Sequence, residues 1–94
     1  IEYQDRYSQA STYSQLGLLS ESLKDFEQAQ LHHLEDLRIC VEFNDQRRMT
    51  FTLGNLNRVY SGTQEEQLLS AVAEILDSTP EDVRQIFANL SEDE

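Results

Sequence analysis

Three residues whose side chains can bind metals or act as nucleophiles stand close together in the sequence: His33, Asp36 and Cys40. In a helix, their spacing would place all three on one face. A metal site needs three or four converging ligands, and three ligands along one straight helix seldom converge on a single ion. A Cys–His nucleophile would also need an orienting third group and an oxyanion hole, and the sequence shows neither. We therefore expect no enzyme activity, no metal and no other cofactor.

These residues also have structural interpretations. His33 is expected to fill a packing position between two helices, and Cys40 to act as a small apolar core residue. His32 and Asp36 lie four residues apart, so they are expected to form an exposed pair on the surface of the same helix.

The composition describes one small, acidic, helical domain. One Pro and three Gly among 94 residues, with few β-branched runs, favour helices. The single Cys excludes an internal disulfide, and no run of 18 apolar residues could span a membrane. No export signal opens the chain, so we expect a cytoplasmic protein. Because the chain does not begin with Met, we also expect a fragment of a longer repeat protein.

The net charge of −11 is unevenly distributed. Residues 1–62 hold nine acids and six bases, whereas residues 63–94 hold nine acids and a single base, Arg84. An acidic surface repels a phosphate backbone, so nucleic acid is not an expected partner, and neither is a membrane.

Apolar residues that recur every three or four positions predict five helices. The helices are expected at about 7–20, 24–42, 45–61, 64–76 and 80–90. Ser-Gly-Thr at 61–63 is expected to form a turn, and Thr79 before Pro80 marks the start of the last helix. The residues expected to face inward are Tyr7, Ala10, Tyr13, Leu16, Gly17, Ser20; Phe26, Ala29, His33, Leu37, Cys40; Phe51, Leu53, Leu56, Val59, Tyr60; Leu68, Leu69, Val72, Ile75, Leu76; and Val83, Ile86, Phe87, Leu90.

Gly17 lies inside the first predicted helix. A glycine in a helix interior costs about 1 kcal/mol relative to alanine. The usual compensation is close approach of a neighbouring helix, which a side chain would prevent. We therefore expect a second helix to contact the first one at Gly17.

The start of the chain is echoed forty residues later. "IEYQDRY" at residues 1–7 aligns with "VEFNDQR" at residues 41–47, and Thr12, Leu16 and Leu19 then align with Thr52, Leu56 and Val59. A single pair of helices cannot bury its apolar faces, but a stacked second pair can, and stacking produces repeats at a fixed period. The echo predicts two helix–turn–helix pairs followed by an extra helix.

Residues 13–30, "YSQLGLLSESLKDFEQAQ", resemble a tetratricopeptide repeat. They supply the bulky residue, the Leu-Gly pair, the aromatic and the following Ala of that family as Tyr13, Leu16-Gly17, Phe26 and Ala29. Residues 50–60 resemble the start of the next repeat, and the period of forty is similar to the long subgroup that includes kinesin light chains. The resemblance implies an all-α, right-handed superhelix of antiparallel helix pairs. Its expected parts are one domain at 1–90, with repeats at 5–43 and 44–77 and a capping helix at 79–90, and a frayed acidic tail at 91–94.

The resemblance also implies a binding surface, because the first helix of each pair lines the concave face in this family. The residues implied for that face are Ser11, Ser14, Gln15 and Leu18 in the first repeat and Arg47, Phe51, Asn55 and Arg58 in the second. Asn55 can donate to and accept from a peptide backbone, and the arginines can form two hydrogen bonds to a carboxylate. We therefore expect a non-catalytic scaffold that binds a protein or peptide, with an acidic peptide favoured.

Two alternatives stay open. The candidate residues can have local roles: Arg58 can pair with Glu65 or Glu66 of the next helix, Arg47 can be a solvated residue of the first helical turn, and Phe51 can pack between helices. The chain can also be an oligomerisation element. In that case the open face of the first helix, near Tyr3, Tyr7 and Tyr13, would pair with another copy in a homodimer.

Overall fold

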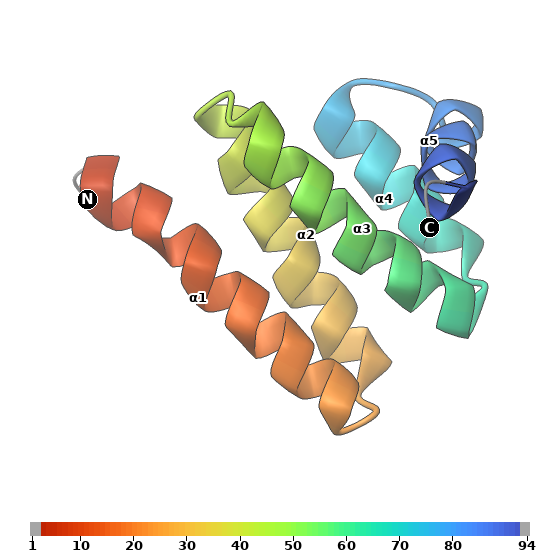
Figure 1. The fold of residues 1–94 in the computed structure, drawn as a ribbon, viewed down its shortest axis with the longest axis horizontal. Helices are drawn as coiled ribbons and strands as arrows, with labels where there is room; N and C mark the ends of the chain where they lie inside the picture. The colour runs from red at the N-terminus through yellow and green to blue at the C-terminus, as the bar shows by residue number, and fades with distance from the viewer. Residues whose placement is uncertain (1–2, 93–94) are drawn as a thin grey trace.

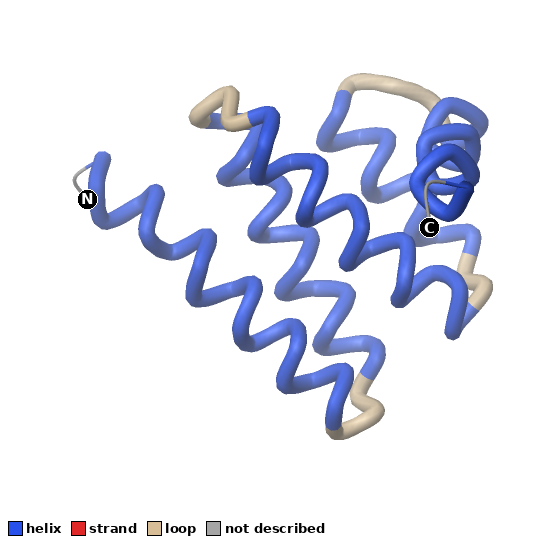
Figure 2. Tube along the Cα trace, in the orientation of Figure 1, coloured by secondary structure: helices blue, strands red, loops and turns tan. Residues whose placement is uncertain are grey.

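The computed structural model describes the backbone of residues 3–92 and the side chains of residues 5–90. This part of the chain is all-helical, with five helices and no strand, as predicted (Figures 1 and 2). The helices are α1 (Tyr3–Ser22), α2 (Phe26–Glu42), α3 (Gln46–Thr63), α4 (Glu66–Leu76) and α5 (Pro80–Glu92). Residues 1 and 2 of the sequence echo and residues 93 and 94 of the expected tail lie outside the described part.

Several helix boundaries differ from the prediction, and α2 and α4 each begin two residues later than expected, at Phe26 and Glu66. α1 extends beyond the predicted 7–20 at both ends. α3 continues through the expected turn at 61–63, because the residue that ends it is Gln64, which adopts a left-handed conformation. α5 continues to Glu92, two residues beyond its predicted end at residue 90. A single Gly or Ser therefore does not end the helix at these positions.

The helices form two layers. α1 and α2 run antiparallel, as do α2 and α3, so α1 and α3 point in the same direction (Figure 1). α1 and α3 lie in front of α2 and α4 in that view, and α5 packs against α3 and α4. This arrangement leaves one side of the α1 and α3 layer open to solvent.

Each of the four connections turns at a non-glycine residue in the left-handed region. The first three of these residues are spaced twenty positions apart: they are Lys24 (φ 61), Asn44 (φ 52) and Gln64 (φ 59), and Asp77 (φ 56) follows. In the first two connections, the N–H of the next aspartate bonds to the carbonyl five residues earlier, at 2.8 and 2.9 Å. The side chains of these aspartates, Asp25 and Asp45, cap α2 and α3. The forty-residue echo therefore corresponds to two successive helix-and-turn units of twenty residues.

The core lies between α2, α3, α4 and α5. Most residues predicted to face inward on α2, α4 and α5 are buried or pack against the core. The prediction was wrong for Tyr7, Leu16 and Phe51, which are 41%, 38% and 54% exposed. The buried face of α1 consists mainly of Ala10, Ser14 and Gly17, so Leu16 lies outside it.

The expected close approach at Gly17 is confirmed. A Cβ atom built on Gly17 would lie 2.4 Å from Cε1 of His33 on α2. His33 is fully buried, so its imidazole fills the space that a side chain at position 17 would need. The small residue in α1 and the large one in α2 together set how closely the two helices pack.

Candidate functional site

Six of the eight residues predicted to line a binding surface are exposed. They are Ser11, Gln15 and Leu18 on α1, and Arg47, Phe51 and Arg58 on α3, and we call them the α1–α3 surface. The other two, Ser14 and Asn55, are only 6% and 4% exposed. A partner could therefore touch little of either residue, and their polar groups act mainly inside the chain.

The α1–α3 surface is hollowed near the start of α3. The open depression has a volume of about 370 Å³ and is lined by Tyr7, Asp45, Arg47, Arg48 and Phe51. Tyr7 joins the two helices here, because its hydroxyl donates a hydrogen bond to the carboxylate of Asp45. Its ring also packs edge-on against Phe43, with ring centroids 5.2 Å apart. Two of the predicted site residues, Arg47 and Phe51, thus meet at one hollow.

The Tyr7–Asp45 hydrogen bond shifts the pKa of both groups. It lowers the pKa of Asp45, and the backbone N–H of Arg48 acts in the same direction. It raises the pKa of Tyr7. The carboxylate at this end of the depression therefore stays ionised and engaged with α1 and with the start of α3.

The two neighbouring arginines of the depression differ in their surroundings. Arg48 turns inward, and its Nε lies 3.2 Å from Oδ1 of the buried Asp36. Arg47 is exposed, and within the described residues no carboxylate lies in ion-pair range of its guanidinium. Arg47 is therefore the cation on this surface that is best placed to meet a ligand.

At the other end of the surface, Glu21 of α1 connects three helices. Arg58 of α3 donates to it through Nε and Nη2, at 2.7 and 2.9 Å, and His33 of α2 lies 2.8 Å away through Nε2. Arg58 also donates to Oδ1 of Asn55 at 2.8 Å. The ion-pair partner that the structure gives Arg58 is therefore Glu21, which the sequence did not suggest. The spacing of residues along α1 could not identify Glu21 as part of this cluster, because the partners of Glu21 lie on other helices.

Both ionisable partners in this cluster have shifted pKa values. Burial favours the protonated form of Glu21, but hydrogen bonds from Arg58 and His33 outweigh it and hold the pKa below its ordinary value. Burial lowers the pKa of His33, although the bond to Glu21 opposes that shift. A neutral imidazole that donates from Nε2 fits this environment, since Nδ1 is buried and has no hydrogen-bond partner among the described residues.

A second polar cluster surrounds Asp36, and it overturns the expected exposed pair with His32. Asp36 is fully buried and accepts hydrogen bonds from Arg48 and from the hydroxyl of Thr52, the latter at 3.0 Å. The sulfur of Cys40 lies 3.5 Å from the same carboxylate. His32 instead stacks on Tyr13 of α1, with ring centroids 6.1 Å apart. Residues of α3 supply the hydrogen bonds that the buried Asp36 carboxylate needs, so Asp36 links α2 to α3.

The side chains of His33, Asp36 and Cys40 are therefore engaged in contacts within the chain. Burial is the main cause that raises the pKa of Cys40 to about 11, so the group is a thiol at neutral pH. His33 contacts Glu21 of α1, whereas Asp36 and Cys40 contact each other and Thr52 of α3. Among the described residues, no group of three potential ligands is arranged to hold a metal ion.

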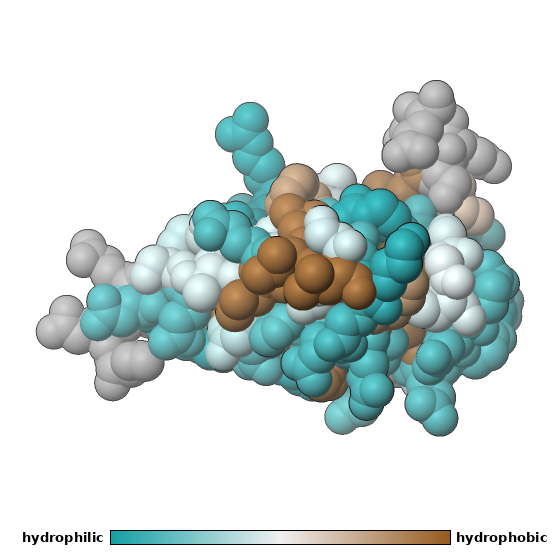
Figure 3. All heavy atoms as spheres, turned by 90° about the horizontal axis from the view of Figure 1, so that it is seen from below, coloured by the Kyte–Doolittle hydropathy of each residue, from teal (hydrophilic) through white to brown (hydrophobic). Residues whose placement is uncertain are grey.

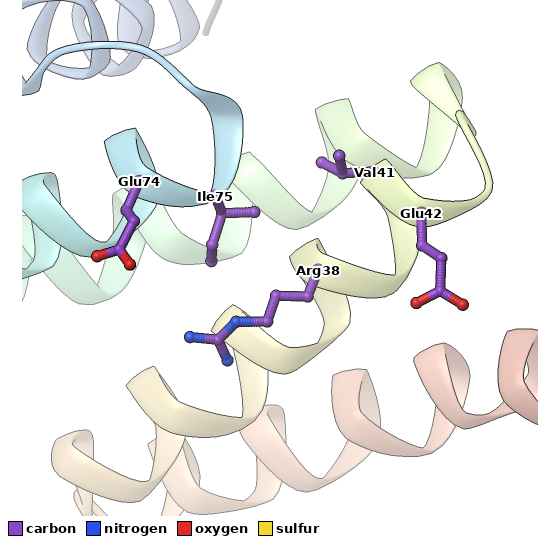
Figure 4. Close-up of a pocket in the computed structure, with 5 residues that line it drawn as sticks. All are labelled: Arg38, Val41, Glu42, Glu74 and Ile75. Atoms are coloured by element: carbon purple, nitrogen blue, oxygen red, sulfur yellow. The ribbon is translucent and has the colours of Figure 1, made fainter.

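A second depression, which the sequence gave no reason to expect, lies on the other layer. It has a volume of about 330 Å³ and is lined by Arg38, Val41, Glu42, Glu74 and Ile75 of α2 and α4 (Figure 4). Its charges are mixed, and Arg38 already donates to Glu35 at 3.0 Å. No aromatic ring is among its lining residues, whereas Phe51 lies beside Arg47 in the α1–α3 depression.

Comparisons with protein-family models, with curated proteins and with solved structures find no match to this chain. Within residues 3–92, no helix combines the length and the apolar character needed to cross a membrane. The fold and the surfaces described above are therefore the basis for assigning a function.

Proposed function

We propose that this chain is a non-catalytic protein-interaction module of the tetratricopeptide kind, which binds an extended segment of a partner on the α1–α3 surface. The antiparallel packing of α1 on α2 and of α2 on α3, the parallel course of α1 and α3, and connections recurring every twenty residues support this proposal. The close contact at Gly17 is also what the Leu-Gly pair of such repeats would provide.

The observation that carries the proposal is the depression between Tyr7, Arg47 and Phe51. Phe51 offers a half-exposed aromatic ring, and Arg47 offers a guanidinium that can form two hydrogen bonds to a carboxylate. A peptide with an apolar side chain next to an acidic one matches this pair. The apolar residue would be buried against the ring, and the acid would meet Arg47.

Arg58 and Asn55 have a supporting role in this proposal. Arg58 spans the two helices by holding Glu21, and Asn55 holds Arg58. Groups that fix α1 against α3 before a ligand arrives reduce the entropy that binding must overcome. Ligand contacts at that end would then fall to Ser11, Gln15 and Leu18, which are uncharged.

An NMR titration tests the proposal. The ¹⁵N-labelled chain is mixed with a ten-residue peptide that carries one Phe between Glu residues, and with a matched peptide in which Lys replaces Glu. We expect the acidic peptide to shift the amide signals of Tyr7, Arg47 and Phe51. Phe51→Ala should weaken binding roughly tenfold through lost apolar burial. Arg47→Ala should weaken it roughly three- to tenfold, as expected for a partly solvated ion pair.

Arg38→Ala is the matched control, because it removes an exposed arginine at the other depression (Figure 4). It should leave the affinity unchanged. Equal binding of the two peptides, or shifts confined to α2 and α4, would exclude the α1–α3 surface as the site.

A further inference from the structure

A band of exposed leucines runs along the outer side of α1 and includes Leu23, the first residue after the helix, whose N–H still bonds to the carbonyl of Leu19 at 3.1 Å. Leu16, Leu19 and Leu23 are 38%, 56% and 72% exposed, and they follow Thr12 at intervals of four, three and four residues. This spacing keeps them on one helical face. In Figure 3, which looks up at α1 from below, apolar side chains gather in one band between polar ones. We call Thr12, Leu16, Leu19 and Leu23 the outer stripe.

The outer stripe has a buried counterpart in the second repeat. Shifted by forty residues, Thr12, Leu16 and Leu19 become Thr52, Leu56 and Val59, which are 0%, 0% and 1% exposed. Thr52 donates to Asp36 of α2, which runs antiparallel to α3, and Leu56 and Val59 lie in the core with residues of α2, α4 and α5. The same pattern is thus a helix-docking face in α3, and on α1 no described helix covers it.

The charges indicate what covers this face. The chain has a net charge of −11, so two copies repel each other over most of their surface. Residues 7–20, which include Thr12, Leu16 and Leu19 of the outer stripe, contain no charged side chain, and charges of both signs, Glu21 and Lys24, flank Leu23. Two copies can therefore approach through α1 without placing carboxylates opposite carboxylates. An acidic chain that self-associates needs a surface of this kind.

The spacing of the outer stripe is also self-complementary. In an antiparallel pair of α1 helices related by a two-fold axis between residues 17 and 18, Leu16 faces Leu19 of the second copy. Thr12 then faces Leu23 of the second copy, and each contact occurs twice, as two-fold symmetry requires. The antiparallel direction is the one in which α2 already packs on the equivalent face of α3.

We propose that this protein forms a homodimer through antiparallel pairing of its α1 helices along the outer stripe. The proposal goes beyond the peptide-binding function, because it uses a side of α1 different from that of Leu18 and the α1–α3 depression. One helix pair buries less area than a typical stable interface, so the dimer is a weak one that forms with rising concentration. Added salt should strengthen it, because salt screens the repulsion between two acidic chains while apolar contact persists.

Sedimentation velocity over a concentration series tests the proposal. The wild-type chain should shift from monomer to dimer, and the shift should occur at lower concentration in 300 mM than in 20 mM NaCl. Leu19→Glu, which places two carboxylates in an apolar contact, should raise the dissociation constant by more than roughly tenfold. Leu18→Glu is the matched control, because Leu18 is also half-exposed on α1 but lies outside the outer stripe. It should leave dimerisation intact.

Cysteine cross-linking tests the geometry separately. Mixed Leu16→Cys and Leu19→Cys chains should form the 16–19 disulfide between copies faster than either chain pairs with itself. Native Cys40 is buried and does not compete. A chain that stays monomeric at millimolar concentration overturns the proposal and leaves a helix of another protein as the occupant. A faster 16–16 disulfide overturns the antiparallel arrangement. Neither result would bear on peptide binding, which the Arg47 and Phe51 variants test.

Discussion

Replacing Gly17 by alanine tests the packing of α1 on α2. The new Cβ would lie 2.4 Å from Cε1 of His33 and 2.7 Å from each ring nitrogen. His33 is fully buried, and its Nε2 is held 2.8 Å from Glu21, so the ring has no free direction in which to move. Atoms this close must separate, either by parting α1 from α2 or by breaking the bond to Glu21.

The expected magnitude follows from three terms. Overpacking a well-filled site costs about 1–3 kcal/mol. Weakening a hydrogen bond to the ionised Glu21 adds about 1.5–3 kcal/mol. The better helix propensity of alanine offsets about 1 kcal/mol of this loss. Gly17→Ala should therefore lower the free energy of unfolding by about 1.5–5 kcal/mol, a large part of the total for a domain of this size.

Urea denaturation followed by circular dichroism measures this change, and the chain supplies its own controls. Gly54 and Gly62 are also helical, but a Cβ at either would meet nothing within 4 Å. Alanine at those two positions should stabilise the fold by about 0.5–1 kcal/mol. In a His33→Ala background the clash is absent, so Gly17→Ala should become neutral or stabilising. If Gly17→Ala stabilises the wild-type chain as Gly54→Ala does, then α1 and α2 are not packed as described.

Two further predictions concern the first connection and the response to pH. Lys24 has a φ of 61, which is unfavourable for a lysine but well tolerated by asparagine; Lys24→Asn should raise the free energy of unfolding by a few tenths to about 1 kcal/mol, whereas Lys24→Ala should bring no gain. Because burial lowers the pKa of His33, the unfolded chain binds a proton near pH 6.5 while the folded chain does not. Urea midpoints should therefore fall as the pH drops from 7.5 to 5.5, and His33→Asn should flatten that decline. The pKa of Glu21 is also lowered, so its contribution is complete above pH 4.5 and is lost below that value. A midpoint that rises on acidification to pH 5.5 would contradict the environment assigned to His33.

Much of the fold could be predicted from the sequence, because it depends on patterns within single helices. The apolar stripes that include Leu37, Val72 and Phe87 recur at helical spacing, and these three residues are buried. Gly17 could be interpreted correctly for the same reason, since a glycine in a helical pattern needs a compensating contact. Helix ends were less predictable. Ordinary residues such as Lys24 and Gln64, rather than glycines, occupy the left-handed positions that end helices.

The candidate site was less accessible to sequence reasoning, because its features depend on contacts between helices. The resemblance to a tetratricopeptide repeat placed Arg47 and Phe51 on the surface, whereas the apolar spacing along α3 alone had assigned Phe51 to the core, where it does not lie. The burial of Asp36 could not be foreseen, since an aspartate is expected at the surface unless partners such as Arg48 and Thr52 satisfy it. The pairing of Arg58 with Glu21 likewise needs the positions of α1 and α3 relative to each other.

The two copies of the repeat show why an apolar pattern predicts a face on which another helix can dock better than it predicts that this face is buried. Leu16 and Leu56 occupy equivalent positions, yet one is 38% exposed and the other 0%. The difference lies in the neighbour, because α2 packs on α3 and no described helix packs on the corresponding side of α1. The leucines on this face have the spacing of a buried helix face, but no described helix covers them. A large apolar face that retains the register of a buried one is better explained by an absent partner than by chance, since exposed leucines in excess favour aggregation. On this reasoning, Leu19→Glu should improve the solubility of the isolated chain, whereas the same charge at Val59 should unfold it.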